Sequence, residues 1–403
     1  MDSDLGVLVI ALSSFHLKRL LSFGLCTWLI LSPNTSDANF CGYLFAPPHF
    51  YMANGRQIPL PELVKEAKKF AREWHKGQKR KFDGKPYFTH PARVAKRLME
   101  HTKDPEMVAA AFLHDVIEDT PASRYLIGSL FGERVARLVS ELTSDKEKIE
   151  EMGSKAEYLA WKMERMSLDA LLIKLADRLD NVSDFESAEW SFIRKYRVET
   201  NYVLSIVGQR QDLTYSHQKL IQDIYRAMSE GETLFRVKEF ARDKYGDLER
   251  KLSEEDYFIH PMRVVGILSK LEVSLEVKTA AYLKDVLEKG TGTTYVEIRE
   301  RFGVVVADLV LELTVNYVER KQFPNRSSYM VERLNKLSEN ALLIMMAGRV
   351  DNLSEIRQLG SPQIFREYVM ESKSLLQALT SREASLSENH KTLLKQIKDL
   401  LAE

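Results

Sequence analysis

The sequence predicts an all-α protein made of two tandem helical bundles. Apolar residues recur at three- and four-residue steps through most of the chain, and no segment keeps the two-residue alternation of a strand. A unit of about 170 residues also occurs twice: Tyr87–Val94 (YFTHPARV) and Ala110–Glu118 (AAFLHDVIE) return as Tyr257–Val264 (YFIHPMRV) and Ala280–Glu288 (AAYLKDVLE). This period is too long for a solenoid and indicates duplicated globular domains.

The repeat sets the predicted domain boundaries. The offset between the two copies is 170 residues at these words and 171 at Leu130–Leu142 against Arg301–Leu313. We expect a leader over residues 1–55, a first copy over residues 56–230 and a second copy over residues 231–403.

Residues 1–55 differ from the rest in being apolar and aromatic. His16, Lys18 and Arg19 interrupt the apolar stretch and argue against a single membrane span. We expect either a targeting segment built on the apolar run Leu20–Leu31, or residues upstream of a true start at Met52.

The composition limits the partners. Lys+Arg and Asp+Glu number 58 each, so net charge gives no indication of a nucleic acid, and we expect none. No membrane association is expected for the body. The two cysteines, Cys26 and Cys41, precede it, which excludes a thiolate metal site there and fits a cytoplasmic protein.

Helix-start signals divide the first copy. Leu60–His75 follows a proline, His90–Pro91 opens the next helix, and Asp104 with Pro105 caps a third. Ser167 begins the long helix that runs to Phe185, and further helices near residues 194–227 complete the bundle. The second copy repeats this order and ends with helices over residues 365–401.

The motif Ala109–Thr120 (AAAFLHDVIEDT) carries the clearest chemistry. On a helix, His114 and Glu118 are one turn apart, as are Asp115 and Asp119. Three carboxylates and an imidazole this close repel one another unless a cation lies among them, which favours a divalent metal.

Two more ligand candidates lie on other predicted helices, and they complete a set of two imidazoles and two carboxylates. Mixed nitrogen and oxygen ligands suit a six-coordinate ion, with Mn²⁺ preferred and Fe²⁺ or Zn²⁺ open. The predicted metal ligands are His90, His114, Asp115 and Asp177.

This H…HD…D order resembles the HD-domain metal-dependent phosphohydrolases. The words GQKRKFDGKPYFTHP, FLHDVIEDT and KLADRLDNV are most similar to the (p)ppGpp hydrolase domain of the RelA/SpoT family, over roughly Leu60–Tyr202. The resemblance implies Mn²⁺-dependent hydrolysis of guanosine 3′,5′-bis(diphosphate) or its pentaphosphate to GDP or GTP and pyrophosphate. Because the repeat accounts for the second half, we expect hydrolysis without synthesis.

The resemblance also implies roles for single residues. Glu118 and Asp119 would orient and activate the attacking water. Arg80 and Asn181 would contact the nucleotide, and Lys81 would help with phosphate or take the place of Arg80. One departure is Asp180, which stands where the family commonly has histidine.

The second copy has lost this chemistry. It keeps His260 and Asp285, but Lys284, Lys289 and Gly348 replace the ligand histidine, the catalytic aspartate and the last ligand aspartate. We expect no metal there, and a degenerate domain that pairs with the first as a partner subunit would. The alternative is a nucleotide-binding regulatory domain that uses Arg250, Lys284 and Lys289.

Two other functions remain open at this level. One is an HD-type phosphatase acting on another small nucleotide, such as NADPH or a nucleoside monophosphate. The other is a non-catalytic nucleotide-sensing protein. The sequence also leaves the oligomeric state open.

Overall fold

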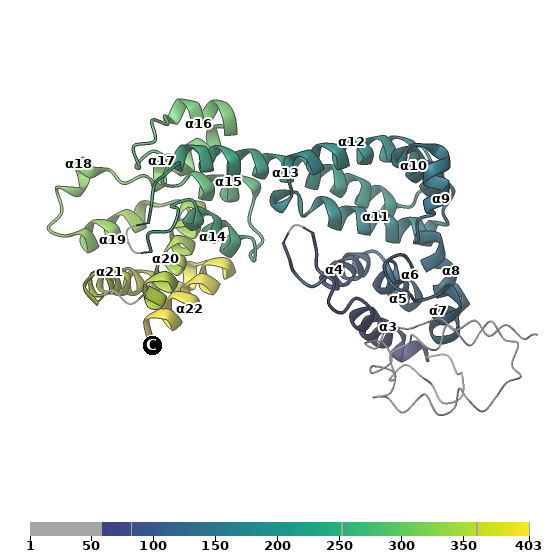
Figure 1. The fold of residues 1–403 in the computed structure, drawn as a ribbon. Helices are drawn as coiled ribbons and strands as arrows, with labels where there is room; N and C mark the ends of the chain where they lie inside the picture. Colours follow the sequence, from purple (N-terminus) through teal and green to yellow (C-terminus); the bar gives the residue numbers. More distant parts are fainter. Residues whose placement is uncertain (1–58, 82, 251–252, 360–361, 403) are drawn as a thin grey trace, which may run out of the picture. The chain divides into compact units, whose positions relative to one another are not determined.

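The computed structural model describes residues 59–81, 83–250, 253–359 and 362–402, so the predicted leader, residues 1–55, lies outside the described residues. Within the described ranges every regular element is a helix, apart from two isolated β-bridges, Lys79–Pro86 and Glu249–Asp256 (Figure 1). The predicted all-α class is confirmed. No helix among these residues is long and apolar enough to cross a membrane.

The helices fall into two series. The first series is α3 (Leu60–Trp74), α4 (Thr89–Leu98), α5 (Pro105–Leu113), α6 (Val116–Asp119), α7 (Arg124–Phe131), α8 (Glu133–Leu142), α9 (Lys146–Met152), α10 (Lys155–Arg165), α11 (Leu168–Val182), η2 (Phe185–Ser187) and α12 (Trp190–Val207). The second is α13 (Tyr215–Tyr245), α14 (Ile259–Leu268), α15 (Leu275–Leu283), α16 (Tyr295–Phe302), α17 (Val304–Leu313), α18 (Tyr317–Arg320), α19 (Arg326–Lys336), α20 (Glu339–Leu359), α21 (Pro362–Thr380), η3 (Glu383–Ser385) and α22 (Glu388–Ala402).

The two series repeat one design. Helices α4 and α14 both have 10 residues, and their starts at Thr89 and Ile259 are separated by the sequence offset. Helices α10 and α19 both have 11 residues and start at Lys155 and Arg326. Because the helices recur where the sequence words recur, the prediction of two tandem helical units is confirmed.

One compact unit comprises the described residues up to Lys76 together with Asp104–Thr143. Helix α3 packs along α5, and both α5 and α7 pack along α8. The ring of Phe70 stacks on Trp74 and meets Phe131 edge-on, each with centroids 5.3 Å apart. All residues from Met107 to Leu113 are buried, so this core fixes the segment that ends at the His-Asp pair.

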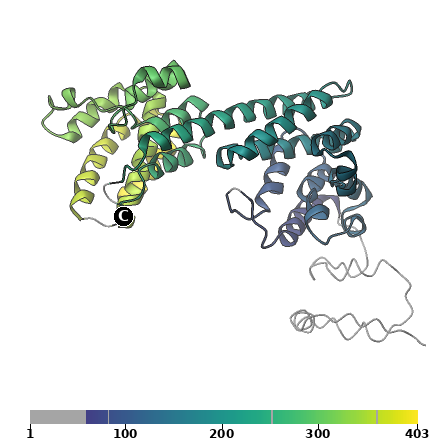
Figure 2. The ribbon, with the colours of Figure 1, turned by 45° about the horizontal axis from the view of Figure 1, so that its top comes forward.

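The other unit comprises Gly77–Lys103 and the described residues from Ser144 onward. The long helix α13 packs on α11 and on α15 (Figures 1 and 2). Near its start His217 bonds through Nε2 to the carbonyl oxygen of Leu168 at 2.9 Å, and at its end the Tyr245 hydroxyl donates to the carbonyl oxygen of Tyr282 at 3.1 Å. The predicted boundary between residues 230 and 231 lies inside α13 and stays a prediction.

A buried arginine anchors the neighbouring helix in each series. Arg178 on α11 donates to Thr200 on α12 at 2.7 Å and to Glu199. In the second series Arg349 on α20 donates to Glu371 on α21 at 2.7 Å. A buried arginine with a carboxylate partner tolerates little displacement, so these contacts set where α11 and α20 lie.

Close packing at Gly231 gives a first testable prediction. A Cβ atom at this position of α13 would lie 2.7 Å from Cβ of Phe185. We expect Gly231→Ala to lower the free energy of unfolding by about 1–3 kcal/mol through overpacking, measured by urea denaturation. Gly266 in α14 is the matched control because a Cβ there meets nothing within 4 Å. Gly266→Ala should therefore raise stability by up to about 1 kcal/mol, and an equal effect of both substitutions would contradict this packing.

Candidate metal centre

The motif Ala109–Thr120 forms two short helices instead of the single helix expected. Helix α5 ends at Leu113 and α6 starts at Val116, with His114 and Asp115 between them. Asp115 has φ −98° and ψ −4°, outside regular helix, and its carbonyl oxygen accepts from the backbone N–H of Asp119 at 2.9 Å to start α6. The His-Asp pair therefore lies at a helix break, which turns the two side chains together.

The tautomer of His114 follows from its backbone contact. Nδ1 of His114 lies 2.9 Å from the carbonyl oxygen of Ala111. A carbonyl oxygen only accepts, so Nδ1 carries the proton and Nε2 presents a lone pair. The Asp115 carboxylate lies beside that nitrogen, with Oδ2 3.1 Å from Nε2.

The same reasoning applies to His90 at the start of α4. Nδ1 of His90 donates to Oδ2 of Asp180 at 2.7 Å, so Nε2 again presents a lone pair. Nε2 lies 3.1 Å from Oδ1 of Asp177 on α11. If the ring is neutral, this nitrogen and the carboxylate oxygen repel at such a separation unless a metal cation lies between them, whereas a proton on Nε2 would make the contact an ion pair. A divalent ion held by both atoms would remove this repulsion.

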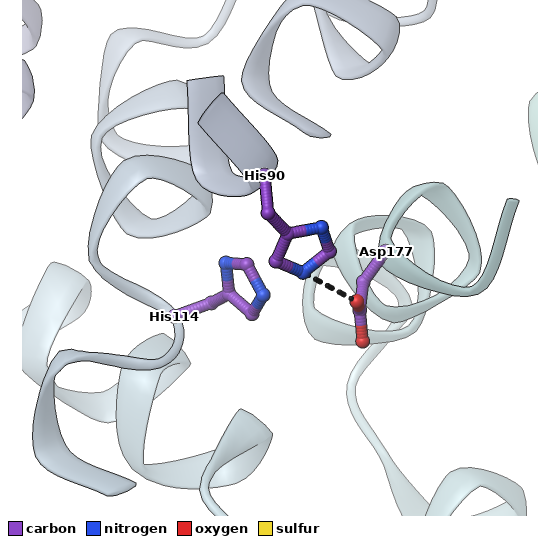
Figure 3. A group of neighbouring side chains, drawn as sticks. All are labelled: His90, His114 and Asp177. Atoms are coloured by element: carbon purple, nitrogen blue, oxygen red, sulfur yellow. Dashed lines mark ion pairs between the residues drawn. The ribbon is translucent and has the colours of Figure 1, made fainter. Parts of the chain in front are cut away.

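Three of the four predicted ligands form a group. One donor atom from each of His90, His114 and Asp177 lies within 4.8 Å of the others, and all three residues are buried (Figure 3). Asp115 adjoins this group through its contact with His114. Two neutral imidazoles and carboxylate oxygens, with no thiolate, form a donor set that fits a divalent ion.

Asp177 is itself held from both sides. Nδ2 of Asn181, one turn along α11, donates to Oδ1 at 2.8 Å, and Nζ of Lys174 lies 2.8 Å from Oδ2. The sequence predicted that Asn181 contacts the nucleotide, and in the structure it contacts the predicted metal ligand Asp177. Through this hydrogen bond Asn181 positions the Asp177 carboxylate, whether or not it also contacts a nucleotide.

Asp180, the departure from the family pattern, is fully buried behind the site. Arg93 forms a two-pronged contact with it, Nε–Oδ1 at 2.7 Å and Nη2–Oδ2 at 2.9 Å, and Nε of Arg97 lies 3.4 Å from Oδ1. Burial raises the pKa of the Asp180 carboxyl, but the hydrogen bonds from His90 and Arg93, together with the charge of Arg93, outweigh burial and lower it to about 2. Asp180 is therefore ionised and orients the ring of His90.

Arg80 joins the same network, because it pairs with Asp184 and its Nη1 lies 3.8 Å from Oδ2 of Asp180. Sequence reasoning did not identify Arg93 or Asp184. A signal was present, since Arg93 is three residues after His90 and Asp180 is three after Asp177, so each pair shares a helix face.

The other predicted site residues lie nearer the surface. Glu118 and Asp119 are exposed on α6, one turn after the His-Asp pair. Lys81 is exposed in the loop that follows the bridging residue Lys79. Their positions leave the roles assigned to them as predictions.

The second copy keeps the supporting pair but lacks two of the four predicted metal donors. Nδ1 of His260 donates to Oδ2 of Asp351 at 2.6 Å, as His90 does to Asp180. Burial and the neighbouring charge of Lys284 lower the pKa of His260 to about 4, so its ring is neutral at pH 7. Nζ of Lys284 lies 2.6 Å from Oδ2 of Asp285. Among the described residues, the group at His90 is the one cluster suited to a metal.

Comparison with known proteins finds similarity in both copies. A model of the family described as HD domain matches residues 67–214 and again residues 238–384. The bifunctional (p)ppGpp synthase/hydrolase SpoT of Escherichia coli K12 is 34% identical over 228 residues, which cover 52% of this chain and 32% of the relative. The guanosine-3′,5′-bis(diphosphate) 3′-pyrophosphohydrolase of Aquifex aeolicus is 33% identical over 219 residues, 54% of this chain and 30% of the relative.

A shorter match is to the probable guanosine-3′,5′-bis(diphosphate) 3′-pyrophosphohydrolase of Mycoplasma pneumoniae, 36% identical over 134 residues, 31% of this chain and 18% of the relative. The chain thus spans less than a third of the length of each of these relatives. A solved structure titled as a metazoan ortholog of SpoT that hydrolyses ppGpp, with a role in starvation responses, is 30% identical. It covers 41% of this chain and 94% of that one, with a TM-score of 0.36.

The contacts of Asp180 with His90 and Arg93 lead to a prediction for a variant that lacks the charge of Asp180. We expect Asp180→Asn to weaken Mn²⁺ binding by about 10–100-fold, because the amide neither holds Arg93 nor fixes His90 as firmly. Isothermal titration with Mn²⁺ measures the change. The matched control is Asp351→Asn, which alters the equivalent pair in the second copy and should leave Mn²⁺ affinity unchanged. Unaltered affinity in Asp180→Asn would contradict the orienting role.

Proposed function

Because the chain belongs to the HD domain family, we propose that its first copy is a metal-dependent hydrolase of guanosine 3′,5′-bis(diphosphate) and the pentaphosphate. The products are GDP or GTP and pyrophosphate. The observation that carries this proposal is the convergence of His90, His114 and Asp177 with both imidazole Nε2 atoms as lone-pair donors. The relatives named for this reaction support the choice of substrate.

In this proposal His90, His114, Asp115 and Asp177 hold the metal. A bound divalent ion would lower the pKa of a water molecule and offset the charge of the substrate's phosphates. Mn²⁺ is the ion we propose, since mixed nitrogen and oxygen ligands without sulfur suit it, and Fe²⁺ and Zn²⁺ are the alternatives.

The remaining site residues act on the water and the nucleotide. A carboxylate of Glu118 or Asp119 accepts the proton of the attacking water, which adds to the phosphorus bonded to the 3′ oxygen. The bond from phosphorus to the 3′ oxygen breaks, pyrophosphate departs, and the 3′ oxygen regains a proton. Arg80, Lys81 and Asn181 contact the nucleotide, and Arg80 exchanges part of its pairing with Asp184 for phosphate.

We further propose that the two copies work as an intramolecular pair. Helix α13 serves both series, and the Tyr282 hydroxyl on α15 donates to Glu186 in η2 at 2.6 Å. The proposed partner is the small nucleotide alone, with neither nucleic acid nor a membrane.

Turnover of purified full-length protein tests the function. With Mn²⁺, anion exchange should resolve equimolar GDP and pyrophosphate from guanosine tetraphosphate. Asp115→Ala should reduce the rate by more than about a hundredfold, since loss of a ligand exceeds loss of an outer contact. Asp212→Ala removes an exposed carboxylate paired with Arg210 and should leave the rate unchanged.

Other outcomes select the alternatives. Release of orthophosphate alone, or turnover of NADPH or a nucleoside monophosphate in preference, would replace this substrate with another on the same metal core. Absence of turnover with Mn²⁺, Fe²⁺ and Zn²⁺ would leave a nucleotide-sensing protein.

A further inference from the structure

The second copy contains a cavity of about 550 Å³ at the position of the lost metal site. This volume lies within the range of pockets for small ligands. Its walls include His260 and Gly348 and the carboxylates Asp285 and Glu288. Six basic side chains also line it: Arg250, Lys284, Lys289, Arg326, Arg333 and Arg349.

The side chain of Lys284 lies in the space that corresponds to the side chain of Asp177 in the first copy. A Cβ at Gly348, the counterpart of Asp177, would lie 3.7 Å from Cε and 3.8 Å from Nζ of Lys284. The ammonium group also bonds Asp285, the counterpart of Asp115. The positive charge that balances the Asp285 carboxylate is thus supplied by a lysine side chain of the protein.

Three substitutions convert the first site to the second. Lysine for a neutral histidine adds one positive charge, lysine for aspartate adds two, and glycine for aspartate removes one negative charge. The paired positions, first copy then second, are His114 and Lys284, Asp119 and Lys289, and Asp177 and Gly348.

Two further substitutions have the opposite effect and remove positive charge from the second site. Lys174 and Arg97, which contact carboxylates of the first site, are Met345 and Ile267 in the second. Over these five positions the second site is two charges more positive, which is the charge of a divalent ion.

Four of the six basic groups form ion pairs with described residues, and two do not. Arg250 pairs with Glu355, and Arg326 and Arg349 share Glu371. Within the described ranges, Lys289 lies over the ring of Tyr257, 4.6 Å from its centroid, and Arg333 donates to the carbonyl oxygen of Glu312 at 2.8 Å. Neither forms an ion pair there, so both keep N–H donors for an anion.

The cavity also offers an aromatic surface. Tyr317 is 62% exposed and lines the cavity with Tyr257 and Tyr368. Rings beside basic groups provide stacking for a base next to contacts for phosphate. If the substitutions in the second copy served folding alone, the Lys284–Asp285 pair would be sufficient. That explanation accounts for neither the exposed side chain of Lys289 nor the open volume of the cavity.

From these observations we propose that the second copy binds a diphosphate-bearing nucleotide without a metal ion. The diphosphate contacts Lys289 and Arg333, and the base lies against the tyrosine rings. The copy does not hydrolyse the ligand, because the donors that would hold a metal are replaced. The site is distinct from the first, so its occupancy can be measured when the first copy does not turn over.

Isothermal titration of the full chain in EDTA tests this proposal, since chelation excludes metal-dependent binding and hydrolysis at the first copy. The probes are GDP and inorganic pyrophosphate. We expect saturable binding of one GDP per chain and weaker binding of pyrophosphate, which lacks the base. Lys289→Glu should weaken GDP binding at least about tenfold, since one charge-assisted contact becomes a repulsion.

Matched variants locate the site. Arg333→Glu in α19 should weaken binding as Lys289→Glu does, while Lys162→Glu at the equivalent position of α10 should not. Circular dichroism checks that each variant is folded, and Lys289 lies on an exposed turn where substitution disturbs little. No binding of either probe in EDTA, or binding that Lys162→Glu abolishes and Lys289→Glu leaves intact, would overturn the proposal.

Discussion

The proposed metal centre depends on the hydrogen bond from Nδ1 of His90 to the buried carboxylate of Asp180. This bond fixes the tautomer, so that Nε2 faces Asp177 as a lone-pair donor. Burying a carboxylate costs several kcal/mol, and Arg93 offsets that cost through two contacts on one side of the group. The arginines thus influence the predicted ligand His90 through their contacts with Asp180.

The duplicated copy separates what the fold needs from what the chemistry needs. The His260–Asp351 pair persists in the second copy, where two of the metal donors are gone. The histidine–aspartate pair therefore belongs to the packing of α14 on α20, and its presence does not identify an active copy. The predicted metal donors around this pair distinguish the two copies. In the second copy the ammonium group of Lys284 takes the place of one of these donors.

Much of this arrangement could be predicted from the sequence. The repeated words locate α4, α5 and α11 and their counterparts, because a helix-start proline and long apolar runs are strong local signals. The helix break after Leu113 was missed, since no glycine or proline marks it. The partners of Asp180 were missed too, because periodicity shows which face is buried but not which arginine reaches which carboxylate. Gly231 similarly resembles a breaker, yet it serves the close approach of α13 to Phe185.

The most direct test of the account is the number of metal ions bound per chain. The protein is equilibrated with Mn²⁺, separated from free ion by gel filtration, and measured by inductively coupled plasma mass spectrometry against protein concentration. We predict one tightly bound Mn²⁺ per chain, held by the first copy. Two ions per chain would contradict the loss of the second site, and none would contradict the assignment of the first.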